Sequence, residues 1–109
     1  QKERYKEIIS NQYKNLTYEI KDEKVDGDLA VVTVQIEVYD YRKAISNLNT
    51  ELDTNYDVLE YNNKKLDTLE KVKDKVSYTL DINVLKDNNG NWYLAELSNT
   101  DIKKIQGMY

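Results

Sequence analysis

The chain has 109 residues, in which 16 Lys and Arg face 20 Asp and Glu, and it contains neither His nor Cys. This composition excludes disulfides, Cys-ligated zinc and thiol nucleophiles, and it removes the commonest general base. A net charge of -4 with interspersed Lys and Arg also argues against a surface that binds nucleic acid phosphates. We therefore expect one folded domain over 1–109 that is not an enzyme and holds no cofactor or metal.

The first predicted element is a helix over 1–15. Its apolar positions recur every three or four residues and so lie on one face: Tyr5, Ile8, Ile9 and Tyr13. Strict alternation of apolar and polar residues then predicts two strands, at 16–25 and 29–40, each with one face toward water.

The turn "VDGDL" decides which faces of these strands meet. If Val25 pairs with Leu29 across a three-residue loop, Ile20 lies opposite Val34 and apolar residues meet along the hairpin. A two-residue Asp-Gly turn would instead set Ile20 against Thr33. We expect the three-residue loop.

The segment 42–75 has the apolar spacing of a helix. A single rod over 42–72 would be roughly 47 Å long, whereas a compact domain of this size is only about 34 Å across. We therefore expect a break. The two candidates are "DTNYD" at 53–57, where Thr54 could cap a new helix, and Asn62 with Asn63.

Alternation returns in two last strands, at 76–87 and 92–98. The stretch "LKDNNGNWYLAEL" between them fits a two-residue type I′ turn at Asn89 and Gly90, which would pair Val84 with Ala95. A calcium loop is excluded by spacing, because Gly90 falls at the fourth position from Asp87 rather than the sixth. After Ser98 we expect one helical turn capped by Asn99 or Thr100 and closed at Gly107.

Two groups of residues are candidates for binding. Tyr18, Tyr78 and Tyr93 fall on the predicted core faces; the favoured interpretation is that they replace the absent Phe in the core, and the alternative is that they line a pocket between sheet and helices. Leu85, Trp92 and Leu94 fall together on the outer face of the predicted sheet. In one interpretation they form a surface for self-association or for a partner. In the other, a loop or the terminal helix of the chain folds over them.

The order of elements resembles the NTF2-like and cystatin-like α+β superfamily, in particular the small extracytoplasmic domains of Gram-positive bacterial lipoproteins and membrane-anchored proteins. The stretches that carry this resemblance are "YEIKDEKVDGDLAVVTVQIEVYDY" at 18–41 and "VSYTLDINVLKDNNGNWYLAEL" at 76–97. It implies an N-terminal helix and a curved, four-stranded antiparallel sheet in two hairpins with a helical segment between them. Catalytic members of the superfamily use an Asp-His dyad or an Asp with a Tyr, and this chain offers no such pair on its predicted core faces.

The expected function follows from that resemblance and from the missing catalytic groups. We expect a non-catalytic, extracytoplasmic binding or protein-interaction module, part of a cell-envelope protein whose signal or anchor precedes Gln1. The alternative is a carrier or NTF2-like enzyme for a small apolar ligand. The expected partners are an unidentified protein, such a ligand, or a second copy bound through the outer sheet face, without nucleic acid or membrane insertion.

Overall fold

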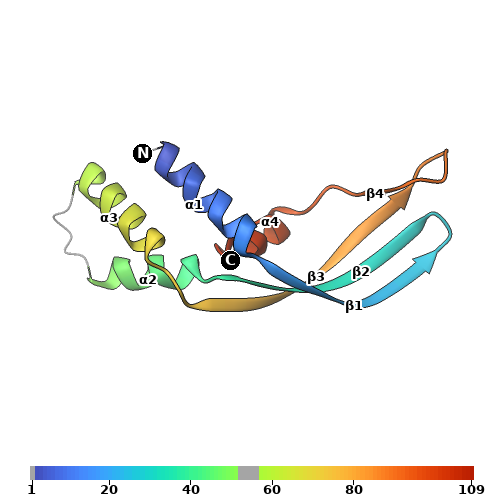
Figure 1. The fold of residues 1–109 in the computed structure, drawn as a ribbon, viewed down its shortest axis with the longest axis horizontal. Helices are drawn as coiled ribbons and strands as arrows, with labels where there is room; N and C mark the ends of the chain where they lie inside the picture. Colours follow the sequence, from blue (N-terminus) through green and yellow to red (C-terminus); the bar gives the residue numbers. More distant parts are fainter. Residues whose placement is uncertain (1, 52–56) are drawn as a thin grey trace.

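The computed structural model describes residues 2–51 and 57–109, which form four helices and one four-stranded antiparallel sheet (Figure 1). In chain order the elements are α1 (Lys2–Asn15), β1 (Thr17–Asp26), β2 (Leu29–Tyr39), α2 (Tyr41–Glu51), α3 (Val58–Glu70), β3 (Lys75–Lys86), β4 (Trp92–Leu94) and α4 (Asn99–Gln106). The strands lie in the order β1-β2-β3-β4, so β1 and β4 are the edges. The predicted α+β class and element order are confirmed.

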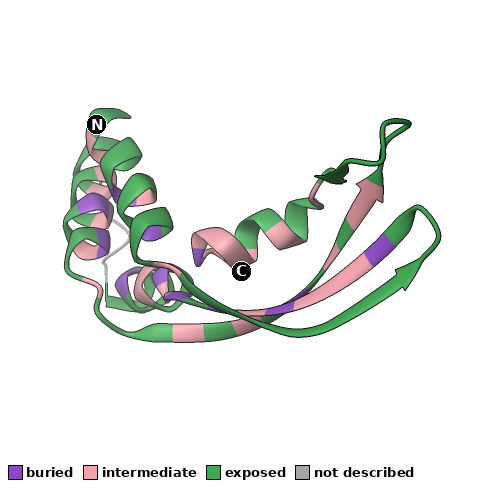
Figure 2. Cartoon of the chain, turned by 45° about the vertical axis from the view of Figure 1, so that its right-hand side comes forward, coloured by how far each residue is buried: buried purple, intermediate pink, exposed green. Residues whose placement is uncertain are grey.

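The molecule is elongated. Helices α1, α2 and α3 gather at one end, and the two hairpins project from them (Figure 1). The extents are 57 × 24 × 22 Å and the radius of gyration is 17.6 Å, compared with about 13 Å for a compact domain of this length. The sheet curves toward the side on which α4 lies (Figure 2). The outer part of the hairpins therefore extends beyond the helices.

The first hairpin has the predicted pairing near the helices, but its turn differs from the prediction. Ile20 pairs with Val34, as expected. However, the turn is a two-residue one, in which Gly27 has a φ of 62° and Asp26 pairs with Leu29, so the predicted three-residue loop is wrong. A register shift between Ile20 and Asp22 accommodates one extra residue in β1 and restores the match of apolar faces.

The segment between the hairpins is two helices. Asp57 caps α3, since its side chain accepts a hydrogen bond from the Glu60 amide. Helix α2 ends at Glu51 and α3 begins at Val58; the first predicted candidate at 53–57, with Thr54, lies outside the described residues except for Asp57. The second candidate is wrong because Asn62 and Asn63 lie inside α3.

The second hairpin differs from its prediction by one residue. Its turn is longer than two residues: the Asp87 amide donates to the Asn91 carbonyl at 2.8 Å, and Gly90 has a φ of 83°. Val84 pairs with Leu94 rather than Ala95, and β4 covers three residues instead of seven. Because neighbouring residues in a strand face opposite sides, this shift exchanges the two faces of β4.

Helix α4 returns over the middle of the sheet (Figure 2). Its cap is Ser98, which accepts a hydrogen bond from the Asp101 amide, rather than the predicted Asn99 or Thr100. It runs for eight residues and ends, as predicted, at Gly107, whose φ is 73°. Ile105 packs against the buried residues of the sheet. The terminal segment thus covers the central strands near the helical end.

The core consists of two clusters. One joins the helices and is formed by Ile8, Tyr41, Leu66 and Leu69. The other lies on the α4 side of the sheet and is formed by Val34, Ile36, Val38 and Leu80. Both clusters lie toward the helical end, and every residue of β1 is exposed.

Gln12 joins three parts of the chain at this end. Its fully buried amide donates to the carbonyl oxygens of Tyr39 and Gln106, each at 3.0 Å, and its oxygen accepts from the Tyr39 amide at 3.0 Å. The side chain therefore satisfies the backbone at the end of β2 and at the last residue of α4. Nearby, Gly107 accepts a hydrogen bond from the Arg42 amide at 2.8 Å.

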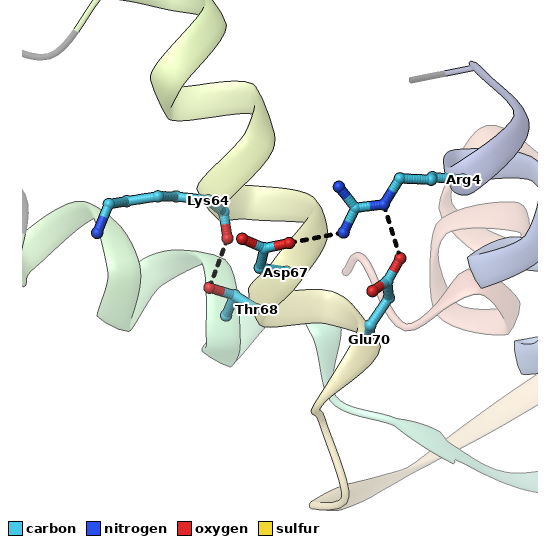
Figure 3. A network of polar contacts seen from close by, with 5 residues as sticks. All are labelled: Arg4, Lys64, Asp67, Thr68 and Glu70. Carbon is cyan, nitrogen blue, oxygen red and sulfur yellow. Dashed lines mark hydrogen bonds and ion pairs between the residues drawn. The ribbon is translucent and has the colours of Figure 1, made fainter.

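A fork of ion pairs fixes α1 to α3 (Figure 3). Arg4 donates from Nη2 to Asp67 Oδ1 at 2.7 Å and from Nε to Glu70 Oε1 at 2.9 Å. The two carboxylates are three residues apart and so lie on one face of α3. The hydrogen bonds from Arg4 hold the pKa of each carboxyl below its usual value.

Arg4→Gln is expected to lower the thermal midpoint at pH 7 and to have a smaller effect at about pH 2. Because both carboxyl pKa values are depressed in the folded state, the fork stabilises the protein above the unfolded-state values of about 4, and that contribution is lost as pH falls through the lowered values. Thermal unfolding of both proteins at the two pH values is the measurement. Lys6→Gln is the control, since Lys6 pairs at 3.8 Å with Glu3 within α1; an equal pH response in both variants would contradict this role of the fork.

Candidate interaction surface

Large apolar side chains are exposed at both edges of the sheet, on the face that α4 partly covers. On β1, Tyr18 pairs with Ile36, Ile20 with Val34 and Val25 with Ala30. Since paired residues share a face, these β1 side chains lie on the same face as the buried sheet core. On β4, Leu94 pairs with Val84 and Trp92 with Lys86, on that same face.

We call these five edge residues the open face. Their exposed fractions are 69% for Tyr18, 52% for Ile20, 65% for Val25, 44% for Trp92 and 58% for Leu94. The two edges are connected across the sheet, because Val25, Ala30, Val84 and Leu94 are successive partners on four neighbouring strands. The open face is thus a continuation of the core beyond the part that α4 covers.

The opposite face of the sheet is mostly polar. Thr33 donates to Asp81 at 2.7 Å, and Gln35 pairs with Thr79. Apolar residues appear there toward the hairpin ends, where Leu85 pairs with both Leu29 and Tyr93. This difference between the faces shows which side of the hairpins resembles a core.

The predicted interface group is divided between the two faces. Trp92 and Leu94 lie on the α4 side, while Leu85 lies on the opposite side with Tyr93. The prediction that all three share the outer face is therefore wrong, and the one-residue difference in the second hairpin is the reason. Trp92 also has a cation over its ring, since Lys86 Nζ lies 5.6 Å from the ring centroid.

The three tyrosines that could line a pocket are not brought together. Tyr18 is exposed at the β1 edge and Tyr93 is exposed on the opposite face. Tyr78 is half-buried and contacts Tyr109 edge to face, with ring centroids 5.7 Å apart. Burial, and then the charge of Asp40, raises the pKa of Tyr78. Of the three, only Tyr78 approaches the predicted role of a core aromatic.

The exposure of β1 was missed by sequence reasoning, which placed Tyr18 on the core face and Ile20 opposite Val34. The direction of Val25 was missed too, because Val25 points to the core side only through the register shift after Ile20. A signal was present in "TYEIKDEKVD", where six of ten residues are charged. Strands with such composition occur at sheet edges, because charges on an edge oppose pairing with other chains.

A groove of about 710 Å³ lies at the helical end, between α1 and the segment after α3. Its lining includes Lys6, Lys14, Lys71 and Lys73 beside Tyr39. Lys14 is in the last turn of α1 and Lys71 caps the C-terminus of α3. These two cations complement the negative ends of two helix dipoles, which gives them a structural role.

Other kinds of site find no support within residues 2–51 and 57–109. No three acidic side chains among them converge closely enough to hold a metal ion. None of their helices has the length and apolar character needed to cross a membrane. Comparison of the chain with protein-family models, with curated proteins and with solved structures gave no match.

Proposed function

We propose that the chain is a non-catalytic interaction module that binds a partner protein through the open face. The observation that carries this proposal is the exposure of five large apolar side chains on the side of the sheet that elsewhere forms the core. Contiguous apolar surface of this kind is uncommon on a monomer unless another molecule covers it. The absence of His and Cys from the sequence also supports a binding role over catalysis.

The proposed location is outside the bacterial cell membrane, within a lipoprotein or membrane-anchored protein of the cell envelope. The resemblance of 18–41 and 76–97 to NTF2-like and cystatin-like extracytoplasmic domains supports this proposal. The expected finding is a lipidated Cys or a membrane-spanning helix encoded upstream of Gln1. Cell fractionation of the full-length product tests it, and recovery in the cytoplasmic fraction alone would refute it.

Photo-crosslinking tests the interaction surface. A photoreactive phenylalanine is placed at position 20 or, as a matched control, at the adjacent position 19, in the organism that makes the protein. Ile20 pairs with Val34 on the α4 side and Glu19 pairs with Gln35 on the opposite side, and both are exposed.

The expected result is a covalent adduct with another protein from position 20 and none from position 19. Equal adducts from both positions, or none from position 20, would overturn the proposed surface. A turnover activity that is lost when Tyr78 is changed to Phe would overturn the non-catalytic assignment.

A further inference from the structure

The charge of the chain is concentrated in the two hairpins. Residues 17–39 and 75–97 together contain nine Asp and Glu but four Lys, a net charge of -5. The rest of the chain contains eleven acidic and twelve basic residues, a net charge of +1. The end of the molecule that carries the open face is therefore acidic, while the helical end is nearly neutral.

Several of these acidic groups lie close to the open face. Glu23 pairs with Val32, so it points to the same side as Ile20 and Val25 and lies between them on β1. Asp22 and Asp26 belong to the same strand and point to the other side. A single sheet layer is thinner than the screening length of about 10 Å at ordinary salt, so charges on both of its sides act on a molecule at the open face.

This distribution decides between two occupants. A second copy bound face to face would bring together two hairpin ends with a net charge of -5 each, and that arrangement is repulsive. A cationic partner would be attracted to the same surface. The attraction comes from the β1 edge rather than from Trp92, because the chain's own Lys86 already lies over that ring, with Nζ 5.6 Å from the ring centroid.

The shape of the face favours a helix. A sheet with one apolar side is ordinarily covered by a second layer, and α4 supplies that layer over the middle of the sheet (Figure 2). We propose, on the basis of the function proposed above, that the open face receives a cationic amphipathic helix of a partner protein. Its apolar side packs on the five edge residues and its Lys or Arg side chains lie over the acidic β1 edge.

A peptide titration of the full chain tests this proposal. The probe is a helical peptide of about 18 residues with Leu on one side and Lys on the other. One control replaces every Lys by Glu, and another has the same composition in scrambled order. Fluorescence of Trp92 reports binding, because Trp92 is the only Trp in the chain and lies in the open face.

The expected result is that the Lys peptide binds at least about tenfold more tightly than either control, and that about 0.5 M salt weakens its binding. Glu23→Lys with Asp26→Lys should reverse the preference between the Lys and Glu peptides. Ile20→Ser with Leu94→Ser should weaken binding of the Lys peptide about tenfold or more. Circular dichroism confirms that each variant is folded.

Three outcomes would overturn the proposal, and they are distinguishable. If the Glu peptide binds as tightly as the Lys peptide and both lose affinity in the Ser variant, the face binds apolar helices without the charge preference. If the Ser variant binds the Lys peptide unchanged, the open face is not the binding surface and the proposed function fails too. If sedimentation shows a dimer that Trp92→Glu dissociates, the occupant is a second copy.

Discussion

Gly107→Ala is expected to lower the free energy of unfolding by about 3 kcal/mol or more. A Cβ at this position would lie 2.1 Å from the Tyr39 carbonyl oxygen and 2.5 Å from Gln12 Nε2. The residue also has a φ of 73°, a conformation that alanine rarely adopts. The new methyl group would therefore separate the end of α4 from β2 and α1. Denaturant unfolding of the parent and variant measures the loss.

Gly27→Ala is the matched control for this prediction. Gly27 has a similar φ of 62°, but nothing lies within 4 Å of a Cβ built there. Its substitution should lower the free energy of unfolding by only about 1 kcal/mol, because alanine is strained in this backbone conformation but meets no neighbouring atom. Equal losses at the two positions would show that the close contacts at Gly107 are not tight in solution.

Gln12→Leu is expected to cost about 3 kcal/mol as well, because it removes three hydrogen bonds from a fully buried site. The substitution keeps the approximate volume of the side chain, so the loss measures unsatisfied backbone groups at Tyr39 and Gln106 rather than a cavity. The same denaturant series gives the value. A loss below about 1 kcal/mol would mean that water reaches these groups when the amide is absent.

Gln12→Glu tests the hydrogen bonds of Gln12 without changing the size of the side chain. An ionised Glu at this position can accept from the Tyr39 amide but faces the carbonyl oxygens of Tyr39 and Gln106 without a proton to donate. Its folded-state pKa is therefore raised. The variant should be closest to the parent below the unfolded-state value of about 4 and should lose stability as pH rises through the folded-state pKa. A constant difference from pH 3 to pH 8 would contradict this account.

The fold class was predictable because the hydrophobic period changes clearly along the chain. The helix over 1–15 and the long strands follow from apolar spacing. The start of α3 after Asp57 does not follow from the length limit of a compact domain, because the molecule is 57 Å long. The cap at Gly107 was also predictable, since glycine alone readily adopts the conformation that closes a helix there.

The registers of the two hairpins were not fully predictable from apolar spacing. In the first, the apolar pairing of Ile20 with Val34 was predicted correctly from the requirement that faces match. That requirement does not say whether the extra residue lies in the turn or in a bulge, and here it lies at Lys21 in the strand.

In the second hairpin a hydrogen-bonding side chain selected a longer turn. The Asp87 carboxylate accepts from the amides of Asn89 and Asn91, both at 2.9 Å. This arrangement favours a three-residue loop that ends with Gly90 in the left-handed conformation over the two-residue Asn-Gly turn. The resulting shift of one residue moved Trp92 and Leu94 to the α4 side of the sheet. The composition of the candidate surface was therefore predictable only in part.

The exposure of β1 depends on tertiary structure and could not be read from alternation alone. Tyr18, Ile20 and Val25 do face the core side, but no helix of the described chain extends far enough to cover them. Alternation predicts the direction of a side chain and not what lies above it. The open face, and with it the proposed function, exists only if the chain leaves these side chains uncovered.

Acrylamide quenching of Trp92 fluorescence in the free chain tests this claim most directly. The structure predicts that quenching approaches that of a solvent-exposed Trp and does not change when the protein is diluted, since Trp92 is 44% exposed in a single chain. Addition of the cationic amphipathic helix should then shield Trp92 from the quencher. Shielding of Trp92 in the free chain at every dilution would contradict the account, because the chain itself would then cover the open face.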